Sequence, residues 1–198
     1  MQNETNVMNN NAQQFFSKKI WTFLALTFFL TALFDVPSVI LNVSGNAASL
    51  FNTAAMWCPA IAALLTKFIF KENINGLLWK WPKTKYLCFA FFIPILYSLT
   101  AYLIIWTFGF GEFYNLNFVK DVAASFGIGQ LSPSIIILFF VLMIGTFGIF
   151  KSAANALGEE IGWRGFLTPE LYNKFGFVKT SLIVGIIWAV WHYPVLIF

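Results

Sequence analysis

The stretch SPSIIILFFVLMIGTFGIF, residues 132–150, contains eighteen consecutive residues without a charge, 133–150. An apolar stretch of about this length crosses the hydrocarbon core of a bilayer as a helix. Ser132 can cap such a helix, and Pro133 suits its first turn. The stretch therefore predicts a transmembrane helix that begins at Pro133.

The composition of the whole chain supports the same class of protein. Of its 198 residues, 59% are hydrophobic and only 10% are charged, whereas soluble domains carry about 25% charged residues. Such a chain cannot cover a water-facing surface, which argues against a soluble enzyme. We expect an integral membrane protein whose partner is the lipid bilayer, and we expect no nucleic-acid partner.

Apolar stretches divide the chain into predicted spans. The predicted fold class is all-α, a polytopic transmembrane helix bundle with about five spans and short interfacial helices. The tail, residues 1–17, is rich in Asn and Gln, so we expect a disordered cytoplasmic segment before a transmembrane domain at 18–198. Residues 112–126 read as a short interfacial helix or loop. The spans are residues 20–41, 47–70, 86–110, 133 to beyond 150, and about 178–198.

The basic residues predict the orientation of the spans. If the spans alternate in direction, eleven of the twelve basic residues lie on one side of the membrane, and only Lys120 lies on the other. Because basic residues concentrate on the cytoplasmic side, we expect a cytoplasmic N-terminus. The eleven are Lys18, Lys19, Lys67, Lys71, Lys80, Lys83, Lys85, Lys151, Arg164, Lys174 and Lys179.

The segment ALGEEIGWRGFL, residues 156–167, places charges just beyond the fourth span. Glu160 and Arg164 are four residues apart and would form an ion pair on one helix face. Glu159 points about 100° away and is less neutralised by Arg164. One interpretation is a cytoplasmic helix end with a surface ion pair. The other is a functional site, since ionisable residues at membrane depth usually face a wet cavity.

A helix break is predicted after this segment. Thr168 can cap a new helix, and Pro169 suits its first turn. The new helix, residues 169–175, would be short and would end at Gly176.

His192 is the only histidine and lies inside the fifth predicted span. Ser181, Gly185, Trp188 and His192 fall on one helical stripe with small residues near its start. A histidine here either forms a structural hydrogen bond between helices or has a catalytic or metal-binding role. Its imidazole can accept a proton, donate one or bind a metal near neutral pH.

Together, Glu159-Glu160-x-x-x-Arg164-Gly165 and Trp188-x-x-x-His192 resemble the motifs of the CPBP intramembrane proteases. This family includes CAAX prenyl endopeptidases and Abi-type bacteriocin-processing or immunity proteins. The resemblance covers residues 153–194, and Trp188 replaces the usual Phe. It implies a membrane-embedded endopeptidase that hydrolyses a peptide or protein substrate at the cytoplasmic face, in a bacterial cell membrane.

The resemblance also implies roles for individual residues. Glu159 would be the general base or a metal ligand, and His192 would orient or deprotonate water or bind the metal. Glu160 and Arg164 would hold the helix and tune Glu159. The cofactor is not fixed by these motifs. A divalent metal such as zinc is one option, with Glu159 and His192 as its ligands.

The family has a third motif, a later His-x-x-x-Asn or His-x-x-x-Asp. This sequence lacks it, since it contains no second histidine. We therefore expect a C-terminally truncated copy of a longer gene, inactive by itself. One alternative is a non-catalytic membrane protein of the same fold, such as an immunity protein or scaffold. Another is a transporter with Glu159 and His192 as a proton relay, although no internal repeat supports it.

Overall fold

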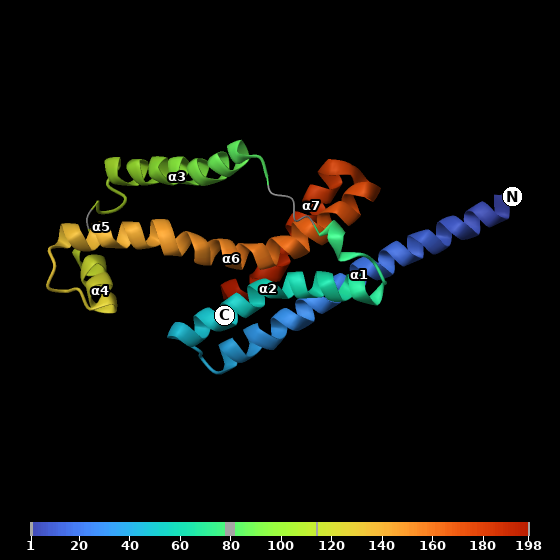
Figure 1. Ribbon diagram of the computed structural model, residues 1–198, viewed down its shortest axis with the longest axis horizontal. Helices are drawn as coiled ribbons and strands as arrows, with labels where there is room; N and C mark the ends of the chain where they lie inside the picture. Colours follow the sequence, from blue (N-terminus) through green and yellow to red (C-terminus); the bar gives the residue numbers. More distant parts are fainter. Residues whose placement is uncertain (1, 78–81, 114, 198) are drawn as a thin grey trace. The chain divides into compact units, whose positions relative to one another are not determined.

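The computed structural model describes residues 2–77, 82–113 and 115–197, and its regular elements are all helical (Figure 1). No described residue belongs to a strand, which confirms the all-α fold class. Lys80, used above for the orientation, lies outside the described residues. The elements are α1 (Gln2–Ile40), α2 (Gly45–Ile69), η1 (Ile74–Gly76), α3 (Thr84–Thr107), α4 (Leu116–Phe126), α5 (Pro133–Met143), η2 (Ile144–Gly148), α6 (Ile149–Glu160), η3 (Ile161–Leu167) and α7 (Thr168–Ile197).

Four helical stretches of the described chain are long and apolar enough to cross a membrane. They are Phe16–Ile40, Gly45–Ile69, Thr84–Thr107 and Pro133–Tyr193. The first three match the first three predicted spans. The fourth contains the fourth predicted span and most of the fifth, because helical backbone continues past Phe150 and, after a turn at Gly176, runs on to Tyr193.

The first helix also includes most of the tail. Its backbone is helical from Gln2, where the composition predicts disorder. A helix without tertiary packing is marginal in water even at this length. Disorder of residues 1–17 therefore stays a prediction.

The chain forms two compact units, residues 80–150 and residues 1–79 with 151–198. In the unit of residues 80–150, α4 packs on α5 through Val119, Val122, Ala123 and Ile136. The side chain of Asn115 caps α4 by accepting a hydrogen bond from the amide of Phe118. This helix occupies most of the region predicted as a short interfacial helix or loop.

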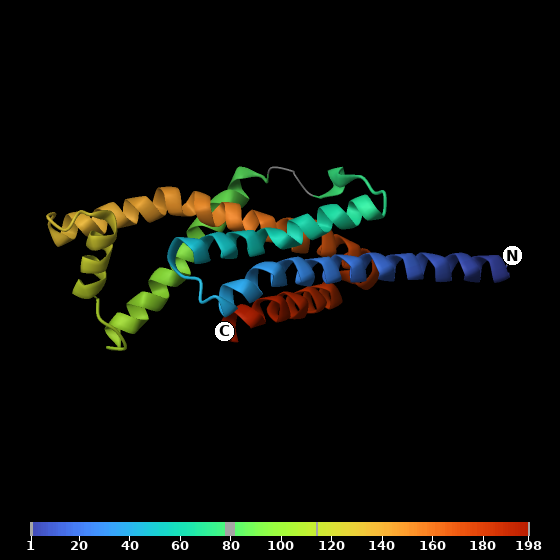
Figure 2. The ribbon, with the colours of Figure 1, turned by 90° about the horizontal axis from the view of Figure 1, so that it is seen from below.

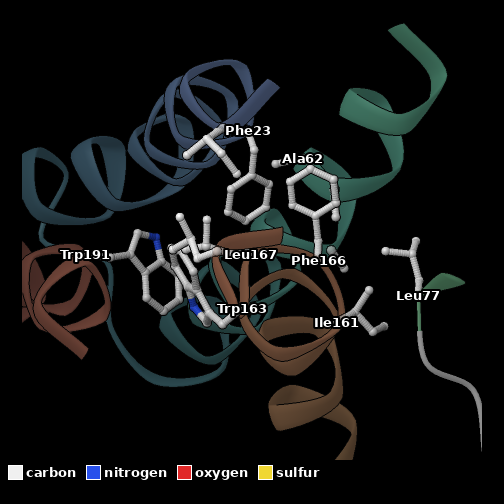
Figure 3. Packing of buried hydrophobic residues seen from close by; sticks show 12 residues of the cluster. Phe23, Ala62, Leu77, Ile161, Trp163, Phe166, Leu167 and Trp191 are labelled. Carbon is white, nitrogen blue, oxygen red and sulfur yellow. The ribbon is translucent and has the colours of Figure 1, made fainter. Parts of the chain in front are cut away.

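The other unit contains both sequence motifs. In it α1 and α2 lie side by side and antiparallel, and the last part of α7 runs along α1 (Figures 1 and 2). The π-helical segment η3 packs against both α2 and α7. Its side chains form the centre of the core with Phe23 of α1, Ala62 of α2 and Trp191 of α7 (Figure 3).

The predicted break at Thr168 is wrong. Thr168 keeps helical dihedral angles, φ −60° and ψ −49°. Its hydroxyl does not cap a new helix but donates a 2.7 Å hydrogen bond to the carbonyl of Trp163, five residues back. The backbone amide of Thr168 donates to the same carbonyl, so the chain remains helical here.

The chain turns instead at Gly176, where φ is 69° and ψ is −178°. This conformation is accessible to glycine but strained for residues with a Cβ. The predicted end of the short helix at Gly176 is therefore confirmed, and the fifth span begins directly after it.

Candidate active site

Two glycines bring the acidic segment into contact with α2. A Cβ added to Gly158 would lie 2.7 Å from the Trp57 ring, and one added to Gly162 would lie 2.4 Å from Pro59. These glycines are four residues apart, the small-xxx-small spacing that lets membrane helices approach closely. Both glycines lie on the helix face that contacts α2. This contact fixes the helix against α2, and with it the position of Glu159, which follows Gly158 in the sequence.

Glu160 and Arg164 form the ion pair that their spacing predicts. Both side chains remain accessible, Arg164 at 62% and Glu160 at 40%. The pair joins the last turn of α6 to η3. Its role in tuning Glu159 stays a prediction.

Glu159 reaches the other motif through Trp188. The indole Nε1 of Trp188 donates a hydrogen bond to Oε1 of Glu159. One turn later, the ring of His192 contacts the Trp188 ring at a centroid distance of 4.2 Å. The His192 Nδ1 lies 3.2 Å from the carbonyl oxygen of Trp188. Trp188 therefore connects the two residues predicted to be catalytic.

The predicted stripe on α7 does border open space. Ser181, Gly185 and Trp188 line a cavity of about 370 Å³. Glu159 and His192 are not among its lining residues. That these two residues face each other across a shared cavity stays a prediction.

Helix α1 also approaches His192, which the motifs did not reveal. The indole of Trp191 donates a 2.9 Å hydrogen bond to the hydroxyl of Thr31. One turn further along α1, Asp35 lies close enough to His192 for their charges to interact. A carboxylate inside a predicted span was the available signal, since such residues are costly in lipid and usually functional.

An ionic cluster fixes the opposite end of the same helices. Lys19, only 6% exposed, lies 2.5 Å from Glu72 and 2.7 Å from Glu170. Lys67 lies 3.2 Å from Glu72. The cluster joins α1, at the beginning of its apolar part, to the end of α2 with the loop that follows it and to the start of α7. These ends lie together, as the predicted orientation requires.

Glu72 lies beyond the spans, in the loop after α2. Burial disfavours its charged form, but hydrogen bonds from Lys19 and Lys67 outweigh that effect and lower the pKa of Glu72 below its ordinary value.

Comparison with known proteins identifies the region around these residues. Residues 133–198 match the family model described as type II CAAX prenyl endopeptidase Rce1-like. The matched residues make up a third of the chain and are similar to this family. The match contains both motifs and confirms the resemblance seen in the sequence.

One similar curated protein is CAAX prenyl protease 2 of Methanococcus maripaludis, 33% identical over 60 residues. The aligned part is 30% of this chain and 18% of the relative. No solved structure matches the chain.

Residues 133–197 do not assemble a zinc site from their own described side chains. Catalytic zinc usually has three protein ligands. In the described part of the chain, no three His, Cys, Asp or Glu residues lie together in a way that could hold a metal. Glu159 and His192 alone do not fit such a site. A divalent metal therefore stays a prediction, and no step below depends on it.

Proposed function

We propose that this chain carries part of the active site of an intramembrane endopeptidase that hydrolyses a peptide bond at the cytoplasmic membrane face. The relative's name, CAAX prenyl protease, suggests substrates with a C-terminal CAAX sequence. The proposal rests mainly on one observation, the hydrogen bond from Trp188 to Glu159. It brings together the two motifs on which the similarity to CAAX proteases rests.

In the proposed mechanism Glu159 is the general base. It takes a proton from a water molecule, whose oxygen attacks the carbonyl carbon of the scissile bond. The tetrahedral intermediate collapses as the C–N bond breaks, and the proton passes from Glu159 to the leaving amine. Positioned bases of this kind contribute about 10²–10⁴-fold to a rate.

The neighbouring residues support this step. The Trp188 indole fixes one oxygen of Glu159, which leaves the other available to water. The ring of His192 packs against Trp188. Its Nδ1 lies near the backbone carbonyl of Trp188, so the other ring nitrogen, Nε2, is the one that can contact water. It would orient the water.

Cleavage of a quenched fluorescent CAAX peptide, prenylated and unprenylated, tests the proposal in liposomes. The chain is assayed alone and as a fusion that adds a segment with the family's His-x-x-x-Asn motif. Cleavage by the fusion that is lost in Glu159→Gln would support the mechanism. Cleavage that survives both Glu159→Gln and His192→Gln would contradict it. Absence of cleavage by every form would favour the non-catalytic alternative, an immunity or scaffold protein of the same fold.

A further inference from the structure

A cavity of about 530 Å³ lies where α1 turns into α2 (Figure 1). Its described walls come from the last turns of α1, the connection that follows and the beginning of α2, and they include no residue of either motif. The volume is within the range of ligand-binding clefts. The proposed reaction gives this hairpin cavity no role.

A carboxylate is the one charged group among the described residues of the wall. It belongs to Asp35, which is partly exposed and forms no ion pair with a described residue. Neither of its oxygens is a buried atom without a hydrogen-bond partner, so a ligand in the cavity can reach them. Within a membrane span, a carboxylate normally has a partner or faces water.

The two cations closest to this end of the hairpin are bonded elsewhere. His192 lies near Asp35 but is not among the described lining residues, and its Nδ1 lies 3.2 Å from the carbonyl oxygen of Trp188. The ammonium group of Lys151 donates a 3.0 Å hydrogen bond to the hydroxyl of Ser49, which is also outside the described wall. The cavity therefore presents negative charge without a bonded positive partner.

Neutral hydrogen-bond acceptors accompany the carboxylate. Ser38 follows Asp35 by three residues and lies on the same face of α1, while Asn42 and Asn52 bring amide groups from the connection and from α2. A primary ammonium group carries three N–H donors, which these oxygens can accept. A quaternary ammonium has no donor and prefers aromatic faces, of which the described wall contains only Phe51.

The rest of the wall suits an alkyl group. Val36, Val39 and Phe51 contribute apolar surface, and the ring of Phe51 contacts that of Phe34 at 6.4 Å, which holds α2 against α1 here. Asp35 lies five residues before the end of α1, about 7.5 Å along the helix axis. An ammonium group bound there would lie near the end of the span, within reach of a lipid headgroup or of a dissolved amine.

We propose that the hairpin cavity binds the primary ammonium group of an alkyl amine, with Asp35 as its counter-ion. The neutral oxygens beside Asp35 accept the remaining N–H donors, and the apolar wall holds the alkyl part. This site is independent of peptide cleavage, so it stands or falls separately from the proposed function.

The test is an NMR titration of the 198-residue chain, labelled with ¹⁵N at asparagine, in phosphatidylcholine nanodiscs at pH 7. Asn52→Ala identifies the side-chain amide signal of Asn52. The probe is n-butylamine, which is protonated at this pH. We expect a saturable shift of the Asn52 signal and a dissociation constant raised roughly tenfold or more in Asp35→Asn, the loss for a hydrogen bond to a charged group.

The matched control is Asp121→Asn, which changes the only other aspartate of the chain; probe binding should not change. The remaining asparagine signals report whether each variant is folded. If Asp35→Asn does not fold, Ser38→Ala decides instead: binding about threefold weaker than in the wild type supports the site, and unchanged binding overturns it.

No saturable shift, or equal affinities in the wild type and Asp35→Asn, would overturn the site. Binding of butan-1-ol or butyltrimethylammonium as tight as that of butylamine would overturn the assignment to a primary ammonium. So would displacement of butylamine by an equal concentration of sodium ions.

Nanodiscs that contain phosphatidylethanolamine in place of half of the phosphatidylcholine distinguish the sources of the ammonium group. A weaker apparent affinity for butylamine in these nanodiscs would identify the lipid headgroup as the ligand. An unchanged affinity would identify a dissolved amine, and the site itself is supported in both cases.

Discussion

The indole of Trp188 donates a hydrogen bond to the carboxylate of Glu159 across 29 positions of sequence. This contact links the E-E-x-x-x-R segment to the W-x-x-x-H segment of the chain. His192 follows one turn after Trp188 and contacts its ring. Glu159 and His192, the two proposed catalytic residues, therefore both contact the side chain of Trp188. The first prediction rests on these contacts.

Glu159→Gln and His192→Gln should each lower peptide cleavage by about 10²–10⁴-fold in any form of the protein that cleaves, without changing its melting temperature. The physical reason is loss of a proton acceptor or of water orientation in a side chain that is not part of the core. Cleavage rates and thermal unfolding measure the two effects. Glu112→Gln is the control, since this carboxylate lies outside both motifs, and we expect it to leave cleavage unchanged. A large fall in thermal stability for Glu159→Gln would instead indicate a structural carboxylate.

Gly162→Ala should destabilise the protein by about 1–3 kcal/mol or more. The new Cβ would meet Pro59 of α2 at 2.4 Å, and its other close neighbours are backbone atoms of the same residue. Gly145→Ala is the control, because no atom lies within 4 Å of its added Cβ. Alanine there should be neutral or slightly stabilising. Equal unfolding free energies for the two variants would show that α2 and the acidic segment do not approach as described.

Lys19→Met should cost much more stability than Arg164→Ala. Lys19 is buried and holds both Glu72 and Glu170, and removing one member of a buried pair costs about 3–5 kcal/mol. We expect the lower end of this range, because both carboxylates remain about a quarter exposed. Arg164 and Glu160 are more accessible, and such pairs contribute up to about 1 kcal/mol. Chemical denaturation in detergent measures the free energy of unfolding of each variant. An equal decrease in Lys19→Met and Arg164→Ala would contradict this prediction.

Glu72 should make stability depend on pH. Its pKa is lower in the folded protein than its ordinary value of 4.5, so the unfolded state binds the proton more tightly. The stabilising contribution of Glu72 is therefore complete above about pH 4.5 and is lost as the pH falls through the folded-state pKa. Melting temperatures from pH 7 to pH 3 should fall for the wild type and fall less for Glu72→Gln. Parallel curves would show that another group controls acid unfolding.

The predicted orientation can be tested by cysteine labelling from outside intact cells. In a background without Cys58 and Cys88, cysteines replacing Lys83 and Lys174 should be protected from a membrane-impermeant reagent. A cysteine replacing Asn46 should react. The reason is the concentration of basic residues at the predicted cytoplasmic ends. Labelling at position 83 from outside would refute this topology.

The sequence by itself predicted the helical membrane fold, most span boundaries and the pairing of Glu160 with Arg164. These features depend on local properties: apolar length, helix periodicity and the reach between residues four apart. Glu159 and His192 were selected through the resemblance of their motifs to a known family, and their catalytic roles stay predictions. Local information failed at Thr168, where a capping pattern was expected but the hydroxyl bonds back to Trp163 in a π turn.

Only the tertiary structure decided which distant side chains meet. The contacts of Trp188 with Glu159 and of Trp191 with Thr31 join helices that are far apart in sequence. Helical periodicity specifies the face of a residue within its own helix, but not the partner helix or the rotation at which two helices pack. Packing sets that rotation, here through glycines 158 and 162 against α2.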